Sequence, residues 1–418
     1  MREATLGSDS PKNRQSPLLR SGLFLPAALM AVAAGFSQPA LCQDAAPDLT
    51  TVGIEAVMNM EVTSVSKTPE RFMEAAAAVQ VITSEDIRRS GATTLPDLLR
   101  LVPGVQVARV NSNTWAVGVR GFTSTLSRSL LVLIDGRSVY SPLFAGVYWD
   151  VQDILLNDID RIEVIRGPGA TLWGANAVNG VINIITKSAQ ATQGAYTSIR
   201  GGNEDRVLAT GRFGGKTSGG MAFRAYGRFA DHDPEFHQNA DDYDGWHLGH
   251  AGFRADADPG ERDHVTIQGD HYDGRAGQRT VISTYSAPYS QTVEEDAELS
   301  GGNLLGQWRR RLGEDSDTTL QVYYDRTHRS QTNFTEDRDT FDVEFRHHLR
   351  LASRHELLWG ACVSSSAPHR GRCSGPRPRA PCACPRGSRA IWWRRGSSIR
   401  PRRPSSGCRA RRTSRRSV

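Results

Sequence analysis

From residue 195 onward, apolar and polar positions alternate in long runs, which is the pattern of extended strands with one apolar face. The alternation is clearest over residues 221–229, 319–325 and 341–350. About nine candidate strands lie between residues 195 and 360. Such alternation fits a half-buried sheet in water. It equally fits strands that cross a membrane with apolar side chains outward and polar side chains inward.

The connections between these strands discriminate between the two interpretations. Every second connection is short and turn-like, namely residues 214–220, 256–261, 313–316 and 352–354. The connections on the other side include residues 231–244 and 274–299, which are long, polar and rich in Asp, Tyr and Ser. Short turns on one side and long loops on the other are typical of a transmembrane barrel.

The preceding part of the chain has helical spacing instead. Thr83 has the position of an N-cap with an acid three residues later, and Gly91 ends that helix. A second helix begins at Thr94, tolerates Pro96 in its first turn and stops at Pro103. The apolar positions at helical spacing are expected to be core residues: Leu95, Leu98, Leu99 and Val102.

Short β-branched strands complete a small α+β domain of about 130 residues. They are expected at residues 105–110, 116–120, 130–134, 161–166 and 181–186. The connector between the last two strands is rich in turn residues. Gly167 ends the first strand, and Gly174 and Asn179-Gly180 supply positions that tolerate a positive φ.

Residues 161–187 read RIEVIRGPGATLWGANAVNGVINIITK, and this string closely resembles the plug-domain signature of TonB-dependent outer-membrane receptors. The strings LLRLVPGV, VRGF and LVLIDG precede it in the order that this family uses. The resemblance is strong over residues 60–190 and architectural over residues 194–360. It implies an α+β plug domain followed by an antiparallel transmembrane β-barrel, of which only the first strands are present here.

The resemblance implies a function without covalent chemistry. Such receptors import a scarce metal chelate across the outer membrane of a Gram-negative bacterium, most often a ferric siderophore and otherwise a corrinoid such as vitamin B12. The expected partners are the TonB-ExbB-ExbD energy-coupling complex, the chelate and outer-membrane lipid, with no nucleic acid. We expect no enzyme activity, no cofactor and no resident metal site. A truncated plug fragment that only binds ligand is an alternative.

The family also implies where energy coupling takes place. The TonB box of these receptors lies near the start of the plug, and here that position holds Glu61, Val62, Thr63, Ser64 and Val65. An exposed extended segment can pair its main chain with a partner sheet while requiring little side-chain identity. The alternative is that these residues form the first plug strand.

Two apical loops of the plug are the expected ligand contacts. By their position in the family, the candidate residues are Asn113, Trp115, Tyr140, Phe144, Tyr148 and Trp149. Aromatic side chains in loops give rigid contact area that suits flat ligands. For Phe144 and Trp149, anchoring of the loop on the barrel wall is an equal alternative.

The resemblance gives structural roles in the plug to a further set of residues: Arg120, Gly121, Asp135, Gly136, Arg166, Gly167, Gly174, Asn179 and Gly180. Two of them, Arg120 and Arg166, end plug strands where the family pairs arginines with carboxylates of the barrel.

The N-terminus predicts export. An apolar stretch at residues 22–36 follows Lys12, Arg14 and Arg20 and is too short for a spanning helix, which needs about 20 residues. Residues 1–42 are therefore expected to be a signal peptide. Residues 43–59 form a short polar lead, too short for the added domain of a signalling receptor.

Charge is distributed unevenly along the chain. Residues 361–418 contain 16 Arg but no Lys, Asp or Glu, so residues 1–360 hold 35 basic and 45 acidic residues, a net charge of −10. Five of the six cysteines also lie in this tail. A phosphate-binding tail and a metal-binding cluster are alternatives, but the composition favours translation in the wrong frame. Because such barrels close with about 22 strands, nine strands would leave an open edge in lipid.

Overall fold

The structure is a computed structural model that describes residues 61–368 apart from a few short gaps, together with three short strands beyond them. The gaps are residues 65–66, 68–69, 73–74, 76, 170–172, 175, 239–241 and 353–354, and the later strands cover residues 372–373, 389–395 and 398–399. The expected signal peptide, the polar lead, Val65 and most of the tail lie outside the described residues. No helix in the described part is long and apolar enough to cross a membrane.

The first unit, which we call the plug, is built on a five-stranded sheet in the order β3-β10-β11-β6-β7. Its strands are β3 (Val79–Thr83), β10 (Ile159–Ile165), β11 (Gly180–Thr186), β6 (Leu130–Ile134) and β7 (Arg137–Ser138). β11 pairs with β6 in parallel, and the other pairs are antiparallel. The strands in the middle of this sheet are covered on both faces, and every residue of β6 is buried.

The two predicted plug helices are confirmed, with one difference in length. α3 (Ser84–Ser90) has a complete capping box between Thr83 and Asp86, and Gly91 ends it in the left-handed region at a φ of 68°. α4 (Leu95–Leu98) is a single turn that continues as the 3-10 helix η2 (Leu99–Leu101). The four predicted apolar positions of this segment are all buried to 2% exposure or less.

Short hairpins and 3-10 turns surround this sheet. The hairpins are β1 (Glu61–Val62) with β2 (Glu70–Arg71), β4 (Val105–Asn111) with β5 (Thr114–Val119), and β8 (Tyr140–Ser141) with β9 (Gly146–Val147). The 3-10 turns are η3 (Trp149–Val151), η4 (Leu156–Asp158) and η5 (Gln190–Thr192). The last of these lies in the linker that leads from the plug to the second unit.

The connector between β10 and β11 differs from the expectation in its backbone. Gly174 has a positive φ of 77° as predicted, but the next positive φ belongs to Asn176, not to Asn179 or Gly180. Gly180 instead begins β11, where a Cβ would lie 2.7 Å from the carbonyl oxygen of Ile165. The glycine is required there by close strand approach and not by φ.

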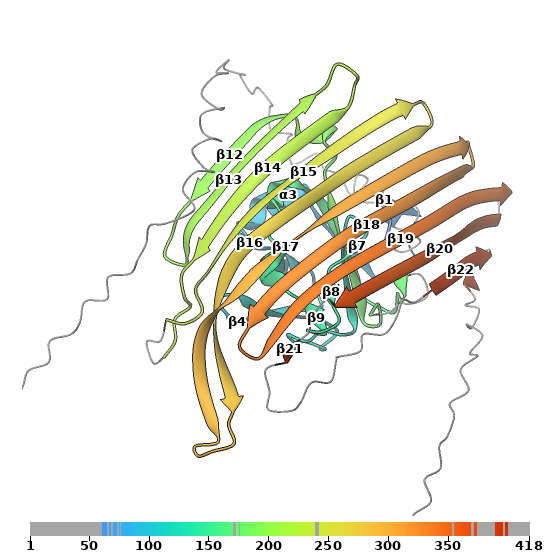
Figure 1. Ribbon diagram of the computed structural model, residues 1–418. Coiled ribbons are helices and arrows are strands. Elements are labelled where there is room, and N and C mark those ends of the chain that lie inside the picture. Colours follow the sequence, from blue (N-terminus) through green and yellow to red (C-terminus); the bar gives the residue numbers. More distant parts are fainter. Residues whose placement is uncertain are drawn as a thin grey trace, which may run out of the picture. The chain divides into compact units, whose positions relative to one another are not determined.

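The second unit is one large antiparallel sheet, which curves around one side of the plug (Figure 1). We call its first nine strands the barrel sheet. They are β12 (Gly194–Arg200), β13 (Asp205–Lys216), β14 (Ala222–His232), β15 (Trp246–Gly260), β16 (Asp263–Ser283), β17 (Ser290–Gly313), β18 (Ser316–Gln331), β19 (Phe334–Ala352) and β20 (His355–Pro368). β21 (Arg372–Cys373), β22 (Arg389–Arg395) and β23 (Ser398–Ile399) are short additions. The sequence predicts about nine strands between residues 195 and 360, and the structure has nine, from Gly194 to Pro368.

Burial follows the predicted alternation. Phe213, Phe253 and Phe341 expose 44–58% of their surface on the outward face. On the face toward the plug, Arg224 and Gln321 are each only 4% exposed. The sheet is therefore apolar outside and polar inside, as in a transmembrane barrel. The fold is an α+β plug followed by part of an antiparallel barrel.

Two predicted boundaries of the barrel sheet are wrong. Residues 274–299 are not a loop, because β16 and β17 stay paired from Gly274↔Leu299 to Ser283↔Ser290, and the loop is only residues 284–289. The strand that was expected to end at residue 360 continues as β20 to Pro368, paired with β19. In both places the backbone ladder continues although the apolar alternation has ended.

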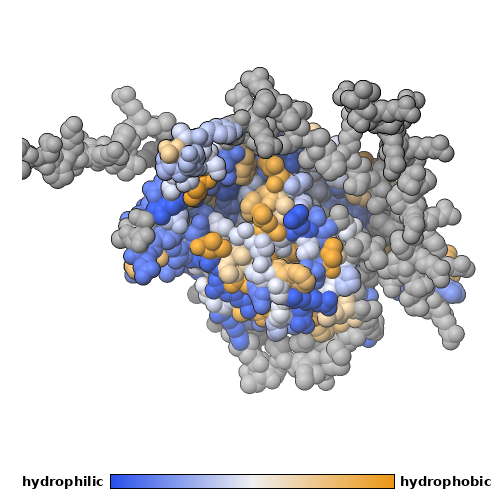
Figure 2. All heavy atoms as spheres, turned by 90° about the horizontal axis from the view of Figure 1, so that it is seen from below, coloured by the Kyte–Doolittle hydropathy of each residue, from blue (hydrophilic) through white to orange (hydrophobic). Residues whose placement is uncertain are grey.

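The paired β16–β17 hairpin extends beyond the rest of the sheet, at the lower end of Figure 1. Figure 2 views the molecule from that end and shows small hydrophobic patches among hydrophilic surface. Exposed aromatic side chains in the loops between barrel strands include Phe236, Tyr285 and Tyr289.

Candidate functional site

The plug contacts the polar inner face of the barrel sheet through many side chains, and this interface is the candidate functional site. At one end the β4–β5 turn docks under the segment between β14 and β15. The Ser112 amide donates to Asp244 Oδ2 at 2.7 Å, and Asn113 Nδ2 donates to the carbonyl oxygens of Asp244 at 2.9 Å and Gly277 at 2.7 Å. Asp244 is completely buried by this contact.

Trp115 lies beside this turn and is only 3% exposed. Its ring packs edge-on against Trp246, with 6.2 Å between the centroids, and Trp246 in turn stacks on His232 at 4.2 Å. Asn113 and Trp115 were expected to contact ligand in an exposed loop. The structure buries both against the barrel sheet, so the expected exposure is wrong for them.

The second predicted loop, residues 140–149, contacts the barrel sheet through Tyr148. The Tyr148 hydroxyl donates to Glu336 Oε2 at 2.9 Å, and the Arg329 guanidinium lies 4.6 Å from the ring centroid. Burial, and next the negative charge of Glu336, raise the pKa of Tyr148 well above its ordinary value, so the phenol keeps its proton and remains a donor. Ser141 donates to the same carboxylate at 2.8 Å.

The neighbours of Tyr148 divide into two groups. Trp149 is 7% exposed and belongs to the main hydrophobic core, which makes it a structural anchor. Tyr140 and Phe144 are only half-buried, and Phe144 stacks on Tyr148 with 4.4 Å between centroids. The ligand role of Tyr140 and Phe144 therefore stays a prediction, whereas Tyr148 and Trp149 are not available in an exposed loop.

A belt of buried ion pairs joins the two units. The plug residue comes first in these pairs: Arg137 with Asp325 at 2.5 Å, Asp150 with Arg329 at 2.7 Å, Asp153 with Arg228 at 2.6 Å, and Asp158 with Arg212. All eight side chains are at most 12% exposed. A cavity lies between the units and is lined by polar groups such as Asp135, His250 and Arg254 as well as by apolar side chains. The plug is thus held against the sheet by charge as well as by apolar packing, since the main hydrophobic core also includes the barrel residues Trp246, Leu248 and Leu299.

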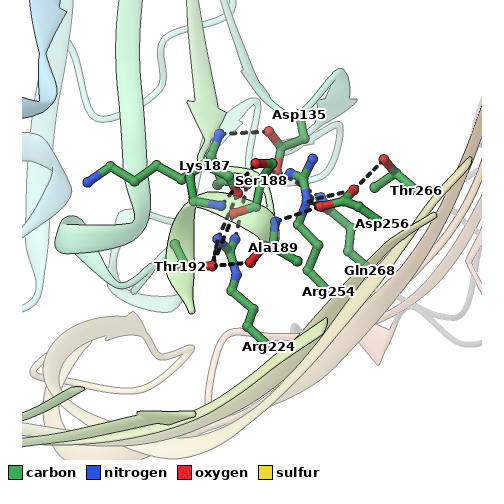
Figure 3. Close-up of polar contacts among 12 residues, drawn as sticks. Asp135, Lys187, Ser188, Ala189, Thr192, Arg224, Arg254, Asp256, Thr266 and Gln268 are labelled. Carbon is green, nitrogen blue, oxygen red and sulfur yellow. Dashed lines mark hydrogen bonds and ion pairs between the residues drawn. The ribbon is translucent and has the colours of Figure 1, made fainter. Parts of the chain in front are cut away.

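The linker from plug to barrel is also bonded to side chains of the barrel sheet (Figure 3). Arg224 Nη1 donates to the Lys187 carbonyl oxygen at 2.7 Å, and the Ala189 amide donates to Asp256 Oδ2 at 2.6 Å. Arg254 holds Asp256 through Nε at 2.9 Å. The linker backbone is therefore hydrogen-bonded to side chains of β14 and β15.

The β6–β7 turn joins this junction through two of the predicted structural residues. Asp135 accepts hydrogen bonds from the amide and the hydroxyl of Thr186 and from Gln268 Nε2, each at 2.8 Å. Asp135 and Gly136 both have positive φ, 49° and 85°. A Cβ at Gly136 would lie 2.8 Å from the Gln321 side chain, so glycine fits both the turn and the close approach.

The other predicted plug residues bond within the plug. Arg120 Nη2 donates to the Arg166 carbonyl oxygen at 2.6 Å, and Arg166 Nη1 donates to the Pro103 carbonyl oxygen at 2.9 Å. Among the described residues neither arginine forms an ion pair with a barrel carboxylate, which is the role that the family resemblance implied. Asn179 Nδ2 donates to Ser129 Oγ at 2.7 Å. Positive φ angles occur at Gly121 (82°) and Gly167 (159°).

The predicted TonB-box segment is not an exposed strand. Val62 and Ser64 are completely buried, and Glu61 pairs with Arg71 in the short β1–β2 hairpin. The amides of Thr63 and Ser64 donate to the buried carboxylate of Glu163. The expected exposure is therefore wrong for Val62 and Ser64, which pack into the plug, and Thr63 is half-buried.

Sequence reasoning missed the acids that hold these contacts, namely Glu163, Asp244, Asp256 and Glu336. A signal existed for Glu163, because it is an acid directly between the apolar residues Ile162 and Val164 of β10. The others lie in polar stretches of the barrel, where one more acid is not distinctive. No cluster of three or more His, Cys, Asp or Glu side chains within the described ranges is arranged to hold a metal ion.

Comparison with known proteins identifies the first unit. Residues 71–181 match the TonB-dependent receptor plug domain family. The vitamin B12 transporter BtuB of Photobacterium profundum is 30% identical over 227 residues, which are 52% of this chain and 35% of the relative. A ferric enterobactin receptor of Pseudomonas aeruginosa is 28% identical over 318 residues, 68% of this chain and 40% of the relative. The chain thus spans less than half the length of either relative.

Solved structures share the fold. The ferripyoverdine receptor of the Pseudomonas aeruginosa outer membrane aligns with a TM-score of 0.59 at 16% identity, over 73% of this chain and 44% of that receptor. At this identity the likeness concerns the fold: a plug packed against barrel strands.

Proposed function

We propose that this chain, whose residues 71–181 match the TonB-dependent receptor plug domain, takes up a scarce metal chelate across the outer membrane, with a ferric siderophore as the first candidate. Relatives that carry names for ferric enterobactin and for vitamin B12 support this class of cargo. The likeness to a ferripyoverdine receptor concerns the fold alone. Export by the signal peptide at residues 1–42 and location in a Gram-negative outer membrane belong to the same proposal.

The observation that carries the proposal is the polar, charge-paired interface between plug and barrel sheet. A plug held by apolar packing alone would expose that apolar surface to water when it moves, which is unfavourable. Here, buried ion pairs and the polar groups of a cavity lie beside the apolar contacts, so part of the interface can be hydrated when the plug separates from the barrel sheet. This suits a plug that moves to open a path. The partner that supplies the energy would be TonB with ExbB and ExbD, acting on residues 61–65.

Cobalamin is the second candidate cargo, since the B12 transporter BtuB is among the similar proteins. The experiment titrates the full chain in detergent with a ferric catecholate, a ferric hydroxamate and cobalamin. Tryptophan fluorescence monitors the binding of each ligand. Saturable binding of one ligand and not of the others assigns the cargo. Binding of none of the three would overturn the chelate class while leaving the plug assignment intact.

A further inference from the structure

Glu163 is an unusual residue for its place in the fold. It lies on β10, the strand between β3 and β11, and is completely buried between Ile162 and Val164, which are also fully buried. A buried carboxylate needs compensating donors, because the charged form loses its hydration. One of these donors is Arg161, whose Nε forms an ion pair with the Glu163 carboxylate at 2.8 Å.

The other donors to Glu163 come from a segment about 100 residues away in the sequence. The Ser64 amide donates to Glu163 Oε2 at 2.8 Å, and the Thr63 amide donates to the same oxygen at 3.1 Å. The Ser64 hydroxyl donates to it as well. Two consecutive backbone amides thus converge on one side-chain carboxylate, which is an arrangement suited to holding an anion.

Ser64 is held from two further sides. Asn183 Nδ2, from β11, donates to Ser64 Oγ at 3.0 Å, and Trp173 Nε1 donates to the Ser64 carbonyl oxygen at 2.6 Å. Ser64 is 0% exposed as a result. The plug therefore has a socket for this residue, formed by Glu163, Asn183 and Trp173.

The same segment contacts the barrel sheet a few residues later. Lys67 Nζ pairs with Glu344 Oε1 at 2.7 Å, and Arg346 Nη1 donates to the Lys67 carbonyl oxygen at 3.2 Å. The segment thus bridges the two units, with its buried end in the plug socket and Lys67 on the sheet.

We infer that Glu163 is the positioning residue of a latch, which keeps residues 63–64 seated in the plug and sets how readily the N-terminal segment is released to an energy-coupling partner. When the segment leaves, Glu163 loses two amide donors and two hydroxyl donors at once, those of Thr63 and Ser64. Its carboxylate then keeps Arg161 as its remaining described partner, and the loss of the other donors favours return of the segment. Release is therefore reversible and close to all-or-none. The inference rests on the proposed function for its partner.

Hydrogen exchange of the full chain in detergent micelles tests the latch without cargo or partner. The variant Glu163→Gln keeps the size of the side chain but removes its charge and one acceptor oxygen. We expect the amides of Thr63 and Ser64 to exchange at least about tenfold faster, since hydrogen bonds to a charged group are the stronger ones. The matched control is Asp160→Asn. Asp160 lies on the same strand and also pairs with Arg161, but it is 46% exposed and has no contact with residues 63–64 among those described.

The same measurement separates a latch from general loosening of the plug. Amides of Ile162 and Ile184, in the β10–β11 ladder, should exchange at wild-type rates in Glu163→Gln. Equal acceleration of the ladder and of residues 63–64, or no difference from Asp160→Asn, would overturn the inference. If Glu163→Gln fails to fold, Ser64→Ala gives the second test, because it removes the hydroxyl donor and should produce a smaller acceleration at the same two amides.

Capture on an immobilised periplasmic domain of TonB tests the link to the partner. Capture should increase for Glu163→Gln and not for Asp160→Asn. Faster exchange with unchanged capture would retain the latch and remove its role in coupling. Because exchange needs no chelate, failure of the cargo titration and failure of the latch are distinguishable.

Discussion

At the scale of single residues, three of the six side chains that sequence reasoning assigned to ligand, Asn113, Trp115 and Tyr148, make buried contacts with the barrel sheet. The residue types were informative, because aromatic and amide side chains in loops do mark contact sites. Their partners were not, since Tyr148 meets Glu336 and Asn113 meets Asp244 across more than 130 positions of sequence. No local pattern encodes such a pairing, and it follows only from docking the plug against β14 to β19.

Tyr148→Phe tests the anchor assignment. The change removes the hydroxyl that donates to Glu336 and leaves a buried acceptor with one donor fewer, so stability should fall by about 1–3 kcal/mol while chelate affinity stays near wild type. Thermal unfolding and ligand titration measure the two effects. Tyr140→Phe, on the half-buried neighbour, is the control and should change stability by less than about 0.5 kcal/mol. A loss of affinity without a loss of stability would restore Tyr148 as a ligand contact.

Glu85 gives a prediction on pH at the surface of α3. Hydrogen bonding to Arg88, and also to Arg89, lowers the pKa of Glu85 from 4.5 to about 2. Because the folded pKa lies below the unfolded one, its contribution to stability is complete above about pH 4.5 and is lost as the pH falls toward 2. Unfolding midpoints of wild type and Glu85→Gln should therefore differ slightly above pH 4.5 and converge near pH 2. A constant difference across that range would contradict the ion-pair assignment.

At the scale of elements, the pattern predicted the parts that have a hydrophobic face. The capping signals at Thr83 and Gly91 predicted α3, and the alternation of apolar and polar residues predicted the barrel strands. The prediction failed where the β16–β17 hairpin leaves the sheet, because strands that face water on both sides need no apolar face while their backbone pairing continues. It failed again at Asn179-Gly180, because a glycine required by close strand approach looks the same in sequence as one required by a turn.

Gly180→Ala and Gly174→Ala separate these two reasons for glycine. At Gly180 a methyl group would lie 2.7 Å from the Ile165 carbonyl oxygen and force β10 and β11 apart, which should lower stability by about 1–3 kcal/mol. At Gly174 nothing lies within 4 Å of the added carbon, and only the positive φ of 77° is strained, at about 1 kcal/mol. Thermal melts should rank Gly180→Ala as the more damaging change. The reverse ranking would contradict the packing assigned to β11.

At the scale of the whole molecule, the two ends of the plug are held by contacts of different kinds. The linker after β11 is bonded by its backbone to Arg224 and Asp256 of the barrel sheet, whereas Ser64 near the start is bonded mainly within the plug. In the latch that we infer, the first arrangement is a fixed attachment, and the second is undone without breaking the belt of buried ion pairs. The order of domains was predictable from the signature string. The division into a fixed end and a releasable end was not, because it depends on which side chains face one another after docking.

Asp256→Ala tests the fixed end. Asp256 is completely buried and accepts from the Ala189 amide, from Thr266 and from Arg254, so its removal leaves Arg254 without its carboxylate and the linker amide without its acceptor. Removing one partner of a buried pair costs about 3–5 kcal/mol, and the unfolding midpoint should fall accordingly. Asp258→Ala is the matched control, because Asp258 lies on the same strand but is 63% exposed and pairs with His264 at the surface. Amide exchange should rise at Ala189 in Asp256→Ala and stay at wild-type rates at Ser64, since the two ends are held by separate contacts. Equal acceleration at both positions would mean that plug and linker loosen as one body, and the distinction between a fixed end and a releasable end would then be wrong.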